Sequence, residues 1–243
     1  MDQIDRLDYQ VFCSQTYMKI NKITASKSDI TLSHDLNDSE INSVVNELKF
    51  ATKNVEIFFS TSSDNKIDFT VTMVSSRSEY DKFLGRPTES WECGWVKPGE
   101  VIIFSPEAYI CETSHPVGQY VKTLTHEICH IFTLKITQCP LFWLNEGIAD
   151  YIADIRYNNH VSTSNLDHFF ANHLFSNINY SEFIQYEGYR IGYTITKYLI
   201  EHYGKEKLFL LLDSDRDKAK MTFLKAINKN ECEFRKELDD LFA

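Results

Sequence analysis

The chain has 243 residues, a length that fits one large domain or a catalytic unit of two lobes. Hydrophobic residues make up 43% and aromatic residues 14%, so the chain can bury a substantial core and is not expected to be disordered. The net charge of −10 argues against nucleic acid and anionic membranes as main partners, because binding to phosphate groups needs clustered Lys and Arg.

The sequence pattern contains neither a secretory signal nor a membrane span. Charged residues interrupt residues 1–30, and the longest apolar runs, such as Leu208 to Leu212, are far too short to cross a bilayer. The six cysteines lie far apart without a C-x-x-C pair, which is typical of free, mostly buried thiols. A cytoplasmic location is therefore expected.

The N-terminal half carries patterns of both strands and helices. Residues 11–20 are a candidate strand, and the helical spacing of apolar side chains predicts an amphipathic helix over residues 39–59. Alternating apolar and polar side chains at residues 67–73 predict a strand with one buried face. A Ser-x-x-Glu capping box at residues 76–79 predicts a short helix, and residues 94–104 fit a hairpin around a Lys-Pro-Gly-Glu turn.

Beyond this point almost every pattern is helical. One helix is predicted over residues 114–131, and the next covers about residues 141–155. From about Ser181 the chain is helical in pattern, with Gly204 as the C-cap between two helices. The expected fold class is therefore α+β, and the change from mixed to helical structure falls near residue 134.

The densest chemical signal is the sequence His-Glu-Ile-Cys-His at residues 126–130. On a helix, positions i and i+4 share a face, so the imidazoles of His126 and His130 can bind one ion. Glu127 then lies beside the ion without coordinating it, where it can take a proton from a zinc-bound water. Cys129 is interpreted as a small buried side chain.

A second motif, Trp-Leu-Asn-Glu-Gly-Ile-Ala-Asp-Tyr, occupies residues 143–151. A catalytic zinc needs three protein ligands and one open position, and two His with one Glu is a known set. Glu146 lies in an otherwise apolar helix, where a carboxylate is costly unless it is paired or metal-bound. Asp150 falls on the same helix face and is placed to accept the free N–H of a ligating histidine.

Together the two motifs resemble the gluzincin zinc metallopeptidases, especially the small peptidase MA-like branch related to aminopeptidase N and thermolysin. The resemblance implies a two-lobed catalytic unit. Residues 1–134 would form an α/β lobe with the zinc helix, and residues 135–243 a helical lobe with the third ligand. It also implies one Zn²⁺ per chain, held by His126, His130 and Glu146, and hydrolysis of a peptide or protein substrate.

The same resemblance assigns roles to residues around the zinc. Asn145 and Asp150 follow the thermolysin pattern of residues that support the ligands. Tyr189 matches a tyrosine that stabilises the tetrahedral oxyanion in the aminopeptidase-like enzymes. Tyr186 and Tyr193 are alternatives for this role, since all three tyrosines lie at the head of the same predicted helix.

Gly94 and Trp95 fall in the stretch that resembles the family's strand along the cleft, whose backbone pairs with an extended substrate; an ordinary core position is the slightly preferred alternative for Trp95. The Gly-x-Met-Glu-Asn signature with which aminopeptidases bind a free amino terminus is absent there, so endopeptidase-like activity is expected, with Glu127 as general base and acid.

One alternative is a zinc-dependent binding or regulatory protein on an inactive peptidase scaffold. Another is a toxin-like or effector protease with one dedicated protein substrate. The sequence leaves the substrate and the oligomeric state open.

Overall fold

The computed structural model describes residues 18–59, 67–137, 141–157, 161–213 and 215–242. Its fold class is α+β, as predicted, because one mixed sheet of five strands is combined with helices that make up most of the remaining chain.

The sheet combines antiparallel and parallel pairs. Its strands are β1 (Lys19–Ala25), β2 (Ser28–His34), β3 (Asp68–Val74), β4 (Gly94–Lys97) and β5 (Glu100–Phe104). Their order is β1-β2-β3-β5-β4, in which β1 with β2 and β4 with β5 are antiparallel and β3 is parallel to both of its neighbours. On β2, Ile30 and Leu32 are fully buried, and their neighbours Asp29, Thr31 and Ser33 are half-buried, which is the alternation of a sheet with one covered face.

Two long helices pack side by side against this sheet. α1 (Asp38–Phe59) buries Val44, Leu48 and Val55 completely, at the helical spacing predicted for it. α4 (Tyr120–Ile136) packs beside α1 and against β4 and β5. Since β4 is the last strand in the described sheet order and pairs there with β5, α4 lies next to an edge of the sheet.

Two short helices follow β3 and β5. α2 (Arg77–Leu84) has the predicted caps: the Ser76 side chain accepts a hydrogen bond from the Glu79 amide, and Gly85 ends the helix in the left-handed conformation at φ 70°. α3 (Pro106–Glu112) is not predicted above, although the Ser105 N-cap and the proline at its start are ordinary helix signals.

The rest of the chain is helical, as predicted. The helices are α5 (Phe142–Ile152), α6 (Thr163–Asn172), α7 (Tyr180–Gln185), α8 (Gly188–Tyr203), α9 (Lys205–Leu208), α10 (Arg216–Ala226) and α11 (Glu231–Phe242). α5 and α8 approach closely because both carry glycine at the crossing: a Cβ on Gly192 would lie 2.5 Å from the carbonyl oxygen of Trp143. Gly204 is the C-cap of α8, as predicted.

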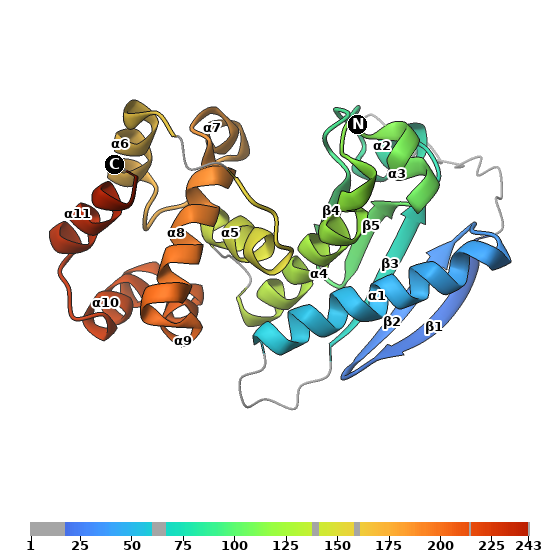
Figure 1. Cartoon of the computed structure of the whole chain (residues 1–243), viewed down its shortest axis with the longest axis horizontal. Coiled ribbons are helices and arrows are strands. Elements are labelled where there is room, and N and C mark those ends of the chain that lie inside the picture. The colour runs from blue at the N-terminus through green and yellow to red at the C-terminus, as the bar shows by residue number, and fades with distance from the viewer. Residues whose placement is uncertain (1–17, 60–66, 138–140, 158–160, 214, 243) are drawn as a thin grey trace, which may run out of the picture.

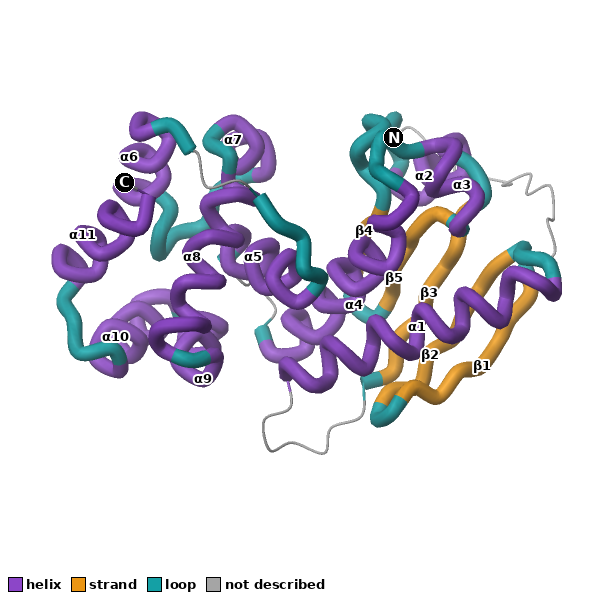
Figure 2. Tube along the Cα trace, in the orientation of Figure 1, coloured by secondary structure: helices purple, strands orange, loops and turns teal. Residues whose placement is uncertain are grey.

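Figures 1 and 2 show that the strands all lie in one half of the molecule and that α6 to α11 lie in the other. α4 and α5 lie where these two halves meet. Among the helices of the described ranges, none is both long and apolar enough to cross a membrane.

Several details differ from the predictions. The hairpin of β1 and β2 is not predicted. Of the strand predicted over residues 11–20, residues 11–17 lie outside the described residues, and Lys19 and Ile20 begin β1. The helix predicted from residue 114 begins later, with a 3-10 turn at Val117–Gln119, because Pro116 is extended. The four cysteines that the structure describes are free, as predicted, but the prediction of mostly buried thiols is wrong for Cys111 and Cys232, which are exposed; Cys129 is buried, as interpreted above.

Candidate metal centre

His126 and His130 lie on one buried face of α4. Only 9% and 8% of their surfaces are exposed. Their Nε2 atoms are 3.1 Å apart, and the two rings are almost perpendicular, with an interplanar angle of 89°. The helical i, i+4 spacing is sufficient to bring these two nitrogens together, because such residues are neighbours on the helix surface.

α5 brings Glu146 to the same point. Glu146 Oε2 lies 3.2 Å from His126 Nε2, and Glu146 Oε1 lies 3.5 Å from His130 Nε2. Each of the three side chains offers one ligand atom, and these atoms all lie within 4.8 Å of one another. The three residues predicted as zinc ligands are therefore brought together by two helices, α4 and α5.

Asp150 contacts His126 from the side opposite Glu146. Its Oδ1 lies 2.9 Å from His126 Nδ1, and its Oδ2 accepts a hydrogen bond of 3.0 Å from the hydroxyl of Tyr157. Burial raises the pKa of Asp150. Burial alone would lower the pKa of His126, but Asp150 and Glu146 outweigh it and hold that pKa well above its usual value. The sequence does not predict the contact of Tyr157 with Asp150, because Tyr157 lies beyond the end of α5 and reaches Asp150 only in the folded chain.

Asn145 lies on the His130 side of the cluster. Its side-chain oxygen accepts a hydrogen bond of 2.5 Å from the hydroxyl of Thr133. Burial lowers the pKa of His130 to about 4, even though the nearby Glu146 and the Asn145 side chain favour the charged ring. Among the described residues, His130 Nδ1 has no hydrogen-bond partner. Asn145 is therefore close to His130, but it does not fix the ring as Asp150 fixes His126.

Glu127 lies on the side of α4 that faces β4. The side chain is buried, with 8% of the residue exposed, and the backbone of Gly94 lies directly against its carboxylate. Burial raises the pKa of Glu127 to about 7; the charge of His126 opposes this shift, and those of Glu146 and Asp150 add to it. A carboxylate with a pKa near neutrality can both accept and return a proton.

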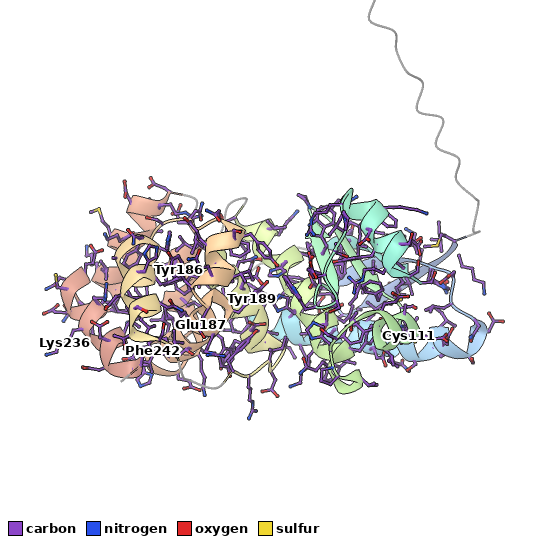
Figure 3. The ribbon with its side chains drawn as sticks, turned by 90° about the horizontal axis from the view of Figure 1, so that it is seen from above. Cys111, Tyr186, Glu187, Tyr189, Lys236 and Phe242 are labelled. Carbon is purple, nitrogen blue, oxygen red and sulfur yellow. The ribbon has the colours of Figure 1, made fainter. Side chains whose placement is uncertain are left out.

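The three candidate tyrosines have different surroundings. Burial raises the pKa of Tyr189, and the nearby carboxylates of the cluster raise it further, Glu146 most of all. Tyr186 instead stacks on His168, with ring centroids 4.0 Å apart, and Tyr193 packs against Tyr157 at 5.7 Å. In Figure 3, Tyr189 lies on the side of the helical half that faces the sheet, and Tyr186 lies deeper within that half.

Three aromatic side chains near this region are exposed. Trp95 on β4 is 37% exposed, so the alternative of an ordinary core position is wrong for it. Trp91, just before β4, and Tyr180, at the start of α7, are 41% and 42% exposed. Their rings stack with centroids 6.3 Å apart and so connect the two halves of the molecule. This pair is not predicted from the sequence, because the contact joins residues that are distant in the chain.

The donor atoms of the cluster fit a bound cation. His126 faces Asp150 through Nδ1, which leaves Nε2 for a second partner, and His130 is uncharged over most of the pH range because of its low pKa. The two Nε2 atoms and the carboxylate of Glu146 therefore direct lone pairs to one buried place. Two imidazoles and one carboxylate form a ligand set suited to zinc.

No protein-family model matches the chain, and no curated protein is significantly similar to it. The case for its function therefore rests on the geometry of its own residues.

Proposed function

We propose that the chain is a zinc-dependent peptidase of the gluzincin type that hydrolyses peptide bonds within a peptide or protein substrate. The observation that carries this proposal is the convergence of His126, His130 and Glu146 within 4.8 Å, with Glu127 beside them. These ligands would hold one zinc ion, which when bound supplies a Lewis acid and lowers the pKa of water to roughly 7. The ligand set comes from α4 and α5, which lie where the two halves of the molecule meet, and this supports a two-lobed catalytic unit.

Glu127 exchanges protons in this proposal. It accepts a proton from the attacking water and returns it to the leaving amine. Its burial against β4 keeps bulk water away, and in the metal-free chain the same burial raises its pKa, which strengthens the carboxylate as a base. Asp150 holds His126 through Nδ1 and so fixes the direction of Nε2.

Tyr189 donates a hydrogen bond to the oxyanion that develops at the scissile carbonyl. Its hydroxyl is un-ionised over the working pH range, because burial and the neighbouring carboxylates raise its pKa, and an un-ionised hydroxyl can donate. Burial and the charge of Glu146 raise the pKa of Tyr189, whereas Tyr186 stacks on His168, which favours Tyr189 over Tyr186. Tyr193 packs on Tyr157, the partner of Asp150, and stays the alternative.

The edge strand β4 supports the choice of an extended peptide as substrate. Among the described strands, residues 94–97 pair with β5 alone, so their other backbone edge can pair with an extended chain. Gly94 lies against Glu127, and Trp95 exposes part of its ring. A peptide bound along this edge would pass beside the proposed zinc without a requirement for a free amino terminus, which fits endopeptidase-like cleavage.

The proposal is tested with Glu127→Gln and a peptide library. The variant should bind zinc like the wild type but lose about 10²–10⁴-fold in kcat, because the amide cannot accept the proton. Tyr189→Phe should lower kcat by about 10²–10³-fold with little change in KM. Full activity in Glu127→Gln would refute the mechanism. A zinc-loaded wild type that cleaves nothing in the library would favour a binding protein on a peptidase scaffold.

A further inference from the structure

Gly94 is the residue of β4 that contacts the side chain of Glu127. A side chain at position 94 would place its Cβ 2.5 Å from both Cγ and Cδ of Glu127, and closer still to Oε1. Carbon atoms that are not bonded to one another do not approach so closely, since their optimal separation is about 3.5–4.0 Å. The Glu127 side chain can therefore occupy this position only because residue 94 has no side chain.

The backbone conformation gives no second reason for glycine at this position. Gly94 stands opposite Ile103 in the regular antiparallel ladder of β4 and β5. The glycines with left-handed φ angles are Gly85, Gly99 and Gly204, so any L residue could adopt the backbone of Gly94. The requirement at position 94 is space beside Glu127.

Glu127 has little room to avoid a larger neighbour. The conflict involves Cγ as well as the carboxylate, so turning the outermost bond would not relieve it. The side chain is buried, and α4 is packed against both α1 and β4, which limits movement of its backbone. A methyl group at position 94 would therefore force the Glu127 side chain into a different rotamer.

We propose that Gly94 is a positioning residue. Because residue 94 has no side chain, the Glu127 side chain packs against the backbone of β4, and its carboxylate is held where it exchanges protons. The catalytic part of this inference rests on the proposed function. The steric part, which is the close contact of Glu127 with residue 94, is independent of that function, because it follows from the packing of β4 on α4 alone.

The test compares wild type, Gly94→Ala, Glu127→Ala and the double variant, all loaded with zinc. Gly94→Ala should keep one zinc per chain and a KM within about twofold of the wild type, while kcat falls by about 10²-fold or more. Its Tm should fall by about 3–8 °C from overpacking. In the Glu127→Ala background, where Cγ, Cδ and the carboxylate are gone, adding Gly94→Ala should change neither the residual rate nor Tm.

Gly118→Ala is the matched control. Gly118 is exposed just before α4, and nothing lies within 4 Å of a Cβ placed there, so zinc content, kcat and Tm should stay at wild-type values. Equal Tm losses from Gly94→Ala in both backgrounds would place the effect in β4 itself and overturn the inference, as would wild-type kcat and Tm in Gly94→Ala. If the wild type cleaves no peptide, the proposed function fails, but the Tm comparison still decides whether Gly94 makes room for Glu127. Failure of the proposed function and failure of this inference can therefore be told apart.

Discussion

The carboxylates of the candidate site and the carboxylate of Glu237 are balanced by different kinds of charge. Glu237, on α11, pairs with Lys229 and accepts hydrogen bonds from the hydroxyls of Tyr198 and Tyr203. Burial raises the pKa of Glu237, but these partners outweigh it and leave the pKa below its usual value. The Glu237 cluster thus contains its own cation.

The candidate site has no such permanent cation among the described residues; the ring of His126, whose pKa is held well above its usual value, is the group that can carry a positive charge there. Its three carboxylates, on Glu127, Glu146 and Asp150, are each at most 8% exposed. Within the part of the chain that the structure describes, no Lys or Arg forms an ion pair with any of them, and their only ion-pair partners are histidines. Buried charges that are not compensated are strongly unfavourable. The Glu237 cluster is therefore complete in itself, whereas the candidate site is suited to a cation from solution.

Removal of zinc should have the largest effect that separates the two clusters. Zinc at 1,000 times its dissociation constant would stabilise the fold by about 4 kcal/mol, which corresponds to a Tm increase of about 8–16 °C for a chain of this size. Calorimetric melting with zinc and with a chelator measures this difference. Glu237→Gln should show the same zinc-dependent increase as the wild type, and His126→Ala should show none; an increase retained in His126→Ala would contradict the ligand assignment.

Loss of the contact behind His126 should have a smaller effect. Asp150→Ala removes the acceptor at His126 Nδ1 and should weaken zinc binding by about 10–100-fold, as measured by competition with a chromogenic chelator. Tyr157→Phe removes only the hydrogen bond to Asp150 Oδ2 and should weaken binding less. Unchanged affinity in Asp150→Ala would mean that the ring of His126 is held by packing alone.

Glu237→Gln should have the smallest effect, a loss of at most about 1 kcal/mol in the free energy of unfolding, because the cluster is partly exposed to water. Since the pKa of Glu237 is lowered in the folded state, its charge stabilises the fold above the unfolded pKa of about 4.3, and this contribution is lost as the pH falls. Urea unfolding should therefore show a difference at pH 7 that decreases as the pH falls below the unfolded pKa, with or without zinc. A loss that does not change with pH would point to packing instead of charge.

The parts of the site that the sequence predicts are those set by local spacing. His126 and His130 share a helix face whatever the rest of the chain does, and Asp150 follows Glu146 by one turn in the same way. The capped helix α2 and the hairpin of β4 and β5 also depend on neighbouring residues.

The parts that the sequence does not predict depend on contacts between distant segments. The stack of Trp91 on Tyr180 and the hydrogen bond of Tyr157 to Asp150 exist only after the two halves meet. The space that Gly94 leaves for Glu127 likewise depends on the packing of β4 on α4.

The central claim is tested most directly by the zinc content of protein purified without added metal, compared between wild type, His126→Ala and Glu146→Ala. The account predicts about one zinc per wild-type chain and none in either variant, with all three proteins folded by circular dichroism. A well-folded wild type that takes up no zinc even when zinc is supplied would contradict it.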